Sequence, residues 1–270
     1  MSAAALVPLE MTVMVPLVTG GGSGIGLGLV EEFLKRGCPK VLITGRRLAV
    51  LEKVAETYRG KVFFLQSDAG NAKDREALLE WVKAEHSDCN ALINNAGIQR
   101  PIPLSQDTAD WQERATEIEI NLNGPIHLCT IFTPYFLSKT NETTVLANVS
   151  SGLAFVPFCA GPVYSATKAA IHNYTMSLRY SLEDTKVRVL EIIPPAVKTN
   201  LGGSHDFGEE LDEYVAATMD RVEAGELEVG YKFSDKGRLA DRATLNGMMQ
   251  FLCNTMRVPK FSQDEKTFGE

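Results

Sequence analysis

The chain has 270 residues, of which 44% are hydrophobic and 23% charged, an ordinary globular composition that excludes a disordered chain, a collagen-like repeat and a small disulfide scaffold. Its 27 Lys and Arg against 34 Asp and Glu give a net charge of −7. An acidic chain lacks the positive surface that binding to nucleic acid requires, so we expect no nucleic-acid partner.

The five cysteines are scattered, with no C-x-x-C spacing, and none of the four histidines lies at a metal-ligand spacing. This pattern predicts reduced thiols in an intracellular protein, without a metal site or a disulfide framework. Residues 11–30 carry no charge, but their glycines and Pro16 break the helical continuity that a membrane span requires. No secretory signal is evident, so we expect a cytoplasmic protein without a membrane anchor. The residues concerned are Cys38, Cys89, Cys129, Cys159, Cys253, His86, His127, His172 and His205.

Apolar runs alternate with segments of helical period, which predicts a doubly wound parallel α/β sheet with helices on both faces. The runs are apolar throughout, as in strands buried on both sides. The expected strands are residues 13–18, 41–44, 62–66, 91–94, 145–149 and 187–193. The expected helices are 24–35, 48–58, 74–85, 111–139 and 163–182, with Asn71 and Asp74 capping the third. No repeat or linker divides the chain, so we expect a single domain over residues 1–270.

The pattern changes after residue 193. Pro194 and Pro195 end the sixth strand, a polar stretch follows, and charged helical segments are expected at 209–224 and 238–253, with no seventh strand. An insertion after the carboxyl end of a strand lies where ligands bind in such sheets. We therefore expect residues 200–232 to be a substrate lid, although a decorative helical excursion would give the same pattern. Residues 257–270 are expected to be a flexible tail.

A glycine-rich loop, TGGGSGIG at residues 19–26, joins the first strand to the first helix. Glycine permits a tight turn and a close approach to a pyrophosphate, and the helix N-terminus supplies N–H groups and the positive end of a dipole. Glycines also serve tight turns with no ligand. The position between an apolar strand and an amphipathic helix nevertheless predicts a dinucleotide site. Its expected residues are Gly20, Gly22, Ser23, Gly24, Ile25 and Gly26.

The end of the second strand indicates which dinucleotide binds. Folds that select NAD usually place a carboxylate there, whereas this chain has Gly45 followed by Arg46 and Arg47. We expect Arg46 to hold a 2′-phosphate by charge-assisted hydrogen bonds, which favours NADP(H) over NAD(H). Solvated arginines in the first turn of a helix are the alternative interpretation. Asp68 is expected to accept from the adenine amino group, or else simply to flank the next helix.

Tyr164 and Lys168 stand one helical turn apart. This spacing also arises by chance, so it gains meaning only from its order among other motifs. The fourth strand ends in residues 94–97 (NNAG), Asn121 lies in a long helix, and Ser151 ends the fifth strand.

In the order and spacing of these motifs, residues 12–199 resemble the short-chain dehydrogenase/reductase family in its single-domain form. The resemblance implies a Rossmann-type fold. The chain is most similar to the oxidoreductase subgroup found with the bacterial D-alanyl–lipoteichoic acid operon, through residues 93–99 (INNAGIQ), 119–121 (EIN) and 151–155 (SGLAF). That similarity does not imply work on lipoteichoic acid.

The resemblance implies four catalytic residues. Tyr164 would be the general acid in carbonyl reduction and the base in reverse, its pKa lowered from about 10 by Lys168 and the oxidised nicotinamide. Ser151 would donate to the substrate oxygen, and Asn121 would interrupt its helix to hold a water that relays protons to Lys168. Pro195 stands where the family usually has glycine. Further cofactor contacts are implied for Ala69, Asn95, Ala96, Gly97, Tyr164, Lys168, Pro194, Val197 and Thr199.

We therefore predict an NADPH-preferring oxidoreductase that interconverts a carbonyl and an alcohol on a small or medium, partly apolar substrate. The apolar character rests on Leu153, Phe155, Pro157 and Phe158, which follow the serine. The resemblance implies a homodimer formed through the helices at 111–139 and 163–182. The alternatives are a non-catalytic NADP-binding regulator that senses redox state, and an enoyl reductase or epimerase on the same fold. A regulator could lose the reactive side chains, whereas this chain keeps them.

Overall fold

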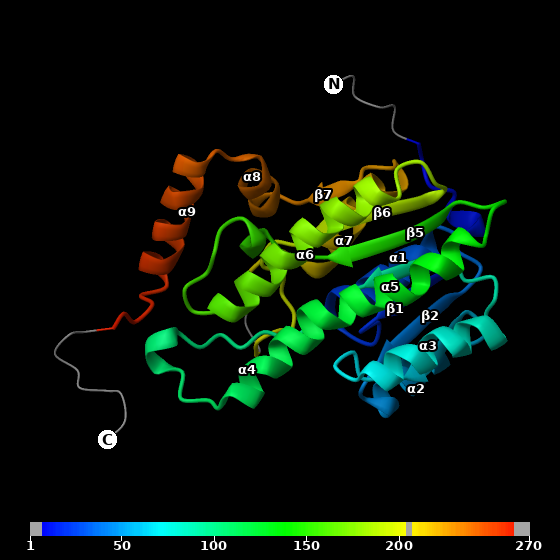
Figure 1. Ribbon diagram of the computed structural model, residues 1–270, viewed down its shortest axis with the longest axis horizontal. Coiled ribbons are helices and arrows are strands. Elements are labelled where there is room, and N and C mark those ends of the chain that lie inside the picture. Colours follow the sequence, from blue (N-terminus) through cyan, green and yellow to red (C-terminus); the bar gives the residue numbers. More distant parts are fainter. Residues whose placement is uncertain (1–6, 204–206, 262–270) are drawn as a thin grey trace.

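The structure is a computed structural model that describes residues 7–203 and 207–261. In this part of the chain, seven strands form one parallel sheet in the order β3-β2-β1-β4-β5-β6-β7. Helices cover both faces of the sheet (Figure 1). The predicted fold class, a Rossmann-type doubly wound parallel sheet, is therefore confirmed.

The described elements follow the predicted alternation. The strands are β1 (Pro16–Thr19), β2 (Val41–Gly45), β3 (Val62–Gln66), β4 (Ala91–Asn94), β5 (Thr144–Val149), β6 (Val187–Ile193) and β7 (Glu228–Gly230). The helices are α1 (Gly24–Lys35), α2 (Leu48–Thr57), α3 (Ala72–Glu85), α4 (Trp111–Ile118), α5 (Gly124–Leu137), α6 (Pro162–Ser181), α7 (Leu211–Glu223), α8 (Phe233–Leu239) and α9 (Arg242–Thr255).

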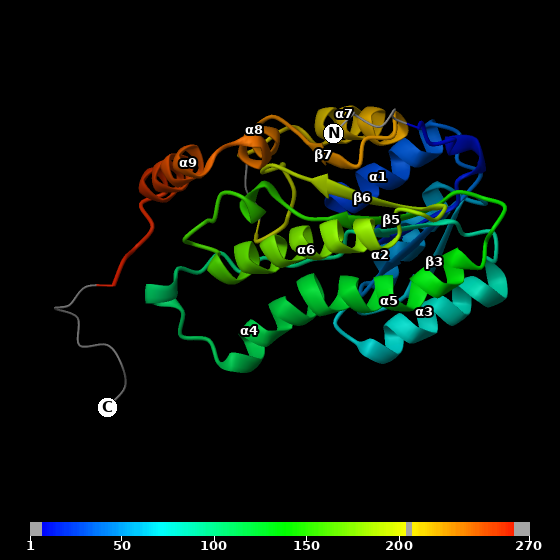
Figure 2. The ribbon, with the colours of Figure 1, turned by 45° about the horizontal axis from the view of Figure 1, so that its top comes forward.

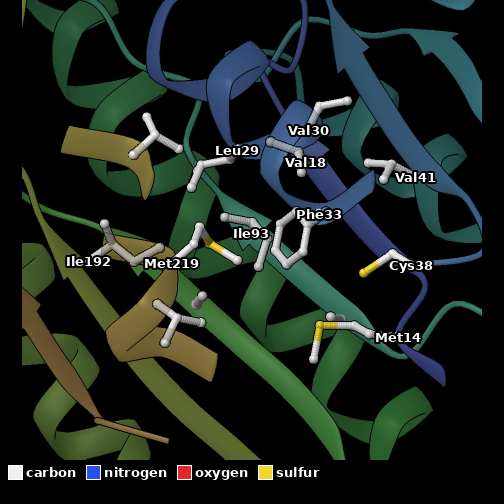
Figure 3. Packing of buried hydrophobic residues seen from close by; sticks show 14 of the residues in the cluster. Met14, Val18, Leu29, Val30, Phe33, Cys38, Val41, Ile93, Ile192 and Met219 are labelled. Atoms are coloured by element: carbon white, nitrogen blue, oxygen red, sulfur yellow. The ribbon is translucent and has the colours of Figure 1, made fainter. Parts of the chain in front are cut away.

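Successive side chains of the strands enter two separate cores, one on each face of the sheet. One core lies under α1, α2 and α7, and Figure 3 shows Phe33 and Leu29 of α1 packed there over Val18 of β1. The other lies under α3 and α5, where Phe132 packs in the same cluster as Leu17 of β1. Because β1 contributes to both cores, it is fixed from both sides, and so is the loop that follows it.

The first strand is shorter than the expected 13–18, because Met11–Val13 forms a 3₁₀ turn. The backbone N–H of Val15 donates to the side-chain oxygen of Asn90 at 2.8 Å, and the Val15 carbonyl accepts from the Asn90 N–H at 3.2 Å, so a single residue before β4 satisfies Val15. The third helix starts two residues earlier than expected, where Asn71 accepts from the N–H groups of Lys73 and Asp74.

The helix expected over 111–139 is interrupted. Residues Glu119–Asn123 form a π-helical turn between α4 and α5. Asn121 lies in this turn, where its Oδ1 accepts from the N–H of Ile98 at 2.9 Å and its Nδ2 donates to the Ile98 carbonyl at 2.8 Å. The oxygen and the nitrogen of the Asn121 side-chain amide thus both bind the loop after β4. These two bonds account for the wider π turn at this residue.

Two expectations for the C-terminal part differ from the structure. A seventh strand exists: β7 pairs in parallel with β6, with Val229 opposite Ile192. Its three residues are too few to show a period in the sequence. The helix expected over 238–253 is present as α9, but it starts only at Arg242, because Ala240 is extended and Asp241 caps α9 by accepting from the N–H of Thr244 at 2.7 Å.

The segment 200–232, expected to be a lid, contains parts of the fold itself. Tyr214, Val215 and Met219 of α7 are buried in the core against α1. A Cβ on Gly28 of α1 would lie 2.9 Å from Val215, so the two helices are in close contact. Because α7 is part of the core, it does not move as a lid. That the residues of the segment 200–232 before α7 close over a substrate stays a prediction. Residues 204–206, with His205, and 262–270 of the expected tail lie outside the described residues.

The prediction that all five cysteines are free thiols is wrong for two of them. Cys159 and Cys253, 94 residues apart in sequence, form a disulfide with a Cα–Cα distance of 6.0 Å. It joins the loop before α6 to α9, a helix that lies apart from the sheet in both ribbon views (Figure 2). Cys38, Cys89 and Cys129 are free and buried. The sequence could not reveal the pair, because only the fold brings the two sulfurs together.

Candidate active site

The predicted site residues follow the carboxyl ends of the strands β1 to β6, apart from Asn121 in the π turn and Tyr164 and Lys168 on α6. The chain order of the sheet reverses between β1 and β4, which have β2 and β5 as their outer neighbours. The loops after β1 and β4 therefore leave in opposite directions and open a crevice, where ligands bind in sheets of this type.

The glycine loop has the backbone that a pyrophosphate cradle requires. Gly20 and Gly24 have φ values of +68° and +53°, in the left-handed region that favours glycine. A Cβ on Gly26 would lie 2.3 Å from the Gly20 carbonyl oxygen and 2.5 Å from Nδ2 of Asn95. The start of α1 therefore lies directly against the loop, so that backbone N–H groups can approach a phosphate closely. The residues present fit a dinucleotide.

Thr19, at the end of β1, fixes the loop to the segment after β4. Its Oγ1 accepts from the N–H groups of Asn95 and Ala96 at 3.0 Å each, and Nδ2 of Asn95 donates to the Thr19 carbonyl at 2.9 Å. The backbone and the side chain of Asn95 thus join the end of β1 to the segment after β4. Thr19 is not among the residues predicted to form the site, although its position directly before the glycines was a signal for it.

A polar hollow lies at the ends of β2 and β3, where the adenosine half of a dinucleotide is expected. The exposed Arg46 and the carboxylate of Asp68 both line it. One oxygen of the Asp68 carboxylate accepts from the N–H of Gly70 at 2.9 Å and so stabilises the turn that contains both residues. Ala69 accepts from Arg75 through its carbonyl at 2.5 Å. The full lining is Arg46, Asp68, Gly70, Asn71, Ala72, Thr116, Glu119 and Ile120.

The structure brings the four predicted catalytic residues to one place. The Ser151 hydroxyl lies close enough to the Tyr164 phenol to lower the pKa of the phenol. The Lys168 ammonium lies 5.5 Å from the centre of the Tyr164 ring and donates to the Val149 carbonyl at 2.8 Å. A Cβ on Gly97 would lie 3.2 Å from Oδ1 of Asn121 and 3.8 Å from Nζ of Lys168, so Gly97 leaves the space between them open.

Burial decides the charges of this cluster. It raises the pKa of the Tyr164 phenol, against the hydrogen bond with Ser151, which lowers it. Burial also lowers the pKa of the Lys168 ammonium to about 8, while the negative charge of Glu191 raises it. The chain's own environment therefore raises the pKa of Tyr164, where the sequence predicted a lowering. The phenol is protonated in this environment.

The remaining predicted contacts lie near the same crevice. Pro194 accepts from the N–H of Gly152 through its carbonyl at 2.8 Å, which places the end of β6 beside the residues that follow Ser151. Thr199 packs against the glycine loop, 3.4 Å from where a Cβ of Gly24 would be. Val197 forms an isolated parallel bridge with Glu209, which holds the chain between β6 and α7.

Two charged residues near the site have no part in the sequence prediction. Arg47 donates from Nη2 to the Ser23 hydroxyl at 3.2 Å, beside the glycine loop. Its place directly after Arg46 was the only signal. Glu191, in the middle of an apolar strand, is fully buried near Lys168. Within residues 7–203 and 207–261, no group of three His, Cys, Asp or Glu side chains could hold a metal ion, and no helix is long and apolar enough to cross a membrane.

The doubly wound sheet, the glycine cradle and the Ser-Tyr-Lys cluster define an oxidoreductase built on a dinucleotide-binding fold. Residues 14–209 match the family described as short chain dehydrogenase. The chain belongs to this family.

Among curated proteins, the chain is 36% identical over 249 residues to the "Uncharacterized oxidoreductase DltE" of Bacillus subtilis, covering 90% of this chain and 97% of that protein. The subgroup resemblance seen in the sequence is thus confirmed. The "NADP-dependent 3-hydroxy acid dehydrogenase" of Schizosaccharomyces pombe is 32% identical over 202 residues, with 72% of this chain and 75% of that protein covered.

Solved structures agree in fold. A short chain dehydrogenase from Burkholderia cenocepacia in complex with NADP has a TM-score of 0.77 and 28% identity, and the match covers 89% of this chain and 99% of that one. A 3-ketoacyl-(acyl-carrier-protein) reductase from Brucella melitensis complexed with NADH has a TM-score of 0.75 and 25% identity, with 83% and 99% covered. Similar proteins thus hold either nicotinamide dinucleotide.

Proposed function

We propose that this protein is an NADP(H)-dependent oxidoreductase that interconverts a carbonyl and an alcohol on a small or medium, partly apolar substrate. The observation that carries the proposal is the meeting of Ser151, Tyr164 and Lys168 beside Gly97, at the edge of the sheet that holds the glycine loop. A regulator that only senses the dinucleotide has no need of a buried phenol beside a serine hydroxyl.

The loop at residues 20–26 would hold the pyrophosphate, Arg46 the 2′-phosphate and Thr199 the nicotinamide end. When bound, NADPH supplies the hydride that reduces a carbonyl carbon. The preference for NADP(H) rests on Arg46 beside the hollow and on Gly45, which ends β2 where folds that select NAD usually have a carboxylate. The NADP named for two similar proteins supports this preference, and the NADH named for a third makes the choice worth measuring.

The chain's own residues would handle the proton. Burial keeps the Tyr164 phenol protonated, which is the form that can donate to a carbonyl oxygen as negative charge develops there. Ser151 would donate to the same oxygen and stabilise that charge. In alcohol oxidation Tyr164 must give up its proton, and the nearby Lys168 ammonium favours the phenolate.

Turnover by the purified protein tests the proposal. NADPH or NADH is mixed with a panel of ketones, aldehydes and 3-oxo acids, and the loss of reduced-nicotinamide absorbance is followed. We expect turnover with at least one apolar carbonyl and faster turnover with NADPH. Tight NADPH binding without turnover across the panel would instead favour the redox-sensing regulator, and reduction of carbon–carbon double bonds would favour an enoyl reductase.

We further propose a homodimer formed through α4, α5 and α6. Trp111 of α4 is 66% exposed, and Tyr180 of α6 is 75% exposed. Between these helices lies an apolar hollow lined by Trp111, Ile118, Leu122, Pro162 and Val163, among others. Sedimentation measures the state: Trp111→Glu should yield monomers, whereas Phe251→Glu, an equally exposed aromatic on α9, should not.

A further inference from the structure

Glu191 is an ionisable side chain in the interior of an apolar strand, with no exposed surface. It lies on the same face of β6 as Val187 and Val189, the face that packs toward α5 and α6. Its Oε1 accepts from the Ser150 hydroxyl at 2.5 Å, and its Oε2 lies 2.8 Å from Nδ1 of His172. A buried carboxylate is costly, so these partners and any nearby cation decide its charge.

We propose that Glu191 is a positioning residue of the active site, which supplies the buried counter-charge of Lys168 and holds Ser150, the residue that precedes Ser151. The proposal rests on the proposed function, because it assigns Glu191 a role through two of the proposed catalytic residues. None of the roles considered above requires a carboxylate at this position.

The two groups are held by adjacent residues at the end of β5. Lys168 donates to the Val149 carbonyl at 2.8 Å, and Ser150, the next residue, donates to Glu191. The N–H of Ser150 also bonds the Ile192 carbonyl at 2.9 Å, which fixes β5 against β6 at this level. Lys168 and Glu191 therefore bind adjacent residues at the end of β5, although no direct ion pair within 4.0 Å joins them among the described residues.

His172 lies one helical turn after Lys168 on α6, so both side chains approach Glu191 from one helix face. The edge-on contact of the imidazole with the Phe155 ring, 4.5 Å between centroids, keeps it in place. The other charged groups on this side are Arg179 of α6 and Glu228 of β7, which form an ion pair with each other at 2.8 Å. Glu191 is thus the carboxylate that Ser150 and His172 hold beside Lys168.

The sign of the effect on Lys168 follows from charge. Burial favours the neutral amine and lowers the pKa of Lys168 to about 8, whereas the carboxylate charge of Glu191 opposes this. Without that charge the lysine would lose its proton at a lower pH. A neutral lysine no longer favours the Tyr164 phenolate, so the reaction would lose rate at the alkaline side of its profile.

The test compares Glu191→Gln, which keeps the shape and can still hydrogen-bond, with Glu228→Gln as a matched control on the neighbouring strand. Turnover is measured from about pH 6 to 10, where lysine and histidine titrate. In Glu191→Gln we expect the alkaline limb to move down by about one pH unit or more. In Glu228→Gln we expect it to stay. A limb that stays in Glu191→Gln overturns the proposal, since lost packing alone would lower the rate equally at every pH.

A second measurement does not depend on turnover. NMR of protein with isotope-labelled lysine and histidine follows the titration of Lys168 and His172 directly. The hydrogen bond to Glu191 raises the pKa of His172, against burial, which lowers it, so both pKa values should fall in Glu191→Gln. An unchanged Lys168 pKa contradicts the proposal even if the protein proves to be no enzyme. If instead Lys168 shifts but no carbonyl turns over, the proposed function fails and the electrostatic pairing stands.

His172→Gln keeps the test open should Glu191→Gln not fold. This change removes a cation and leaves the carboxylate, so the lysine pKa should stay or rise. A fall would contradict the assignment of Glu191 as its counter-charge.

Discussion

The guanidinium of Arg47 donates to the Ser23 hydroxyl at 3.2 Å, so a cation from the end of β2 lies beside the glycine loop. Arg46, the residue before it, lines the hollow that also contains Asp68. Two consecutive arginines thus lie near the predicted dinucleotide site, and we predict that both meet phosphate groups of the cofactor.

Arg46→Ala should raise the dissociation constant for NADPH by about 10- to 100-fold, the value of one or two charge-assisted hydrogen bonds, and change NADH binding little. Fluorescence titration with each nucleotide measures this. Arg59→Ala, at an exposed arginine beyond α2 that pairs only with Glu56 at 3.7 Å among the ion pairs of the described residues, is the control and should leave both constants unchanged. Equal losses for the two nucleotides would contradict the 2′-phosphate role.

Tyr164→Phe should lower turnover by about 100- to 10,000-fold, because it removes the proton donor and leaves the ring. NADPH binding should be largely kept. Tyr180→Phe, on the same helix but 75% exposed, is the matched control and should keep full activity. Undiminished turnover in Tyr164→Phe would overturn the mechanism.

Gly26→Ala should abolish dinucleotide binding and destabilise the fold by about 1–3 kcal/mol. The new Cβ would lie 2.3 Å from the Gly20 carbonyl oxygen, so the loop must shift away from α1. Gly247→Ala in α9 has nothing within 4 Å of its Cβ and should stabilise its helix by up to about 1 kcal/mol. Thermal unfolding with and without NADPH separates the two: NADPH should raise the melting temperature of Gly247→Ala and not that of Gly26→Ala.

Reduction of the disulfide should expose two thiols and leave the other three unreactive. Burial raises the pKa of Cys38, Cys89 and Cys129 to about 12, and thiolates are the reactive form. Iodoacetamide followed by mass spectrometry should label Cys159 and Cys253 after mild reduction, and neither before it. Thiols stay reduced in a reducing compartment such as the cytoplasm, so the pair should be open there. Labelling of Cys129 in the folded protein would contradict the packing of its core.

Cys253→Ser should loosen α9. In this helix Cys253 is the buried residue, and the sheet and its covering helices keep their own cores without it. Limited proteolysis should therefore cut near residues 240–260 sooner in Cys253→Ser, or after reduction of the wild type, than in the oxidised protein. Cuts elsewhere at equal rates would show that the disulfide serves the whole domain.

Local features of the sequence determined the fold class and most of the site. Apolar runs specified the strands up to β6, because strands buried on both faces leave an uninterrupted signal. The glycine loop and the Tyr164–Lys168 spacing placed the crevice, since close backbone approach and helical periodicity depend on residues near in sequence. The family resemblance predicted that Asn121 interrupts its helix, and the π turn at Glu119–Asn123 is that interruption.

Only the tertiary structure decided the contacts that join distant segments. The disulfide joins residues 94 positions apart in the sequence. The strand β7 pairs with the edge of β6, and α7 packs in the core where Gly28 of α1 leaves space for Val215. Glu191 is a charged residue in an apolar strand, and only the fold shows that Ser150 and His172 contact its carboxylate. Spacing and composition record what each segment prefers alone, whereas burial and pKa depend on which segments the fold brings together.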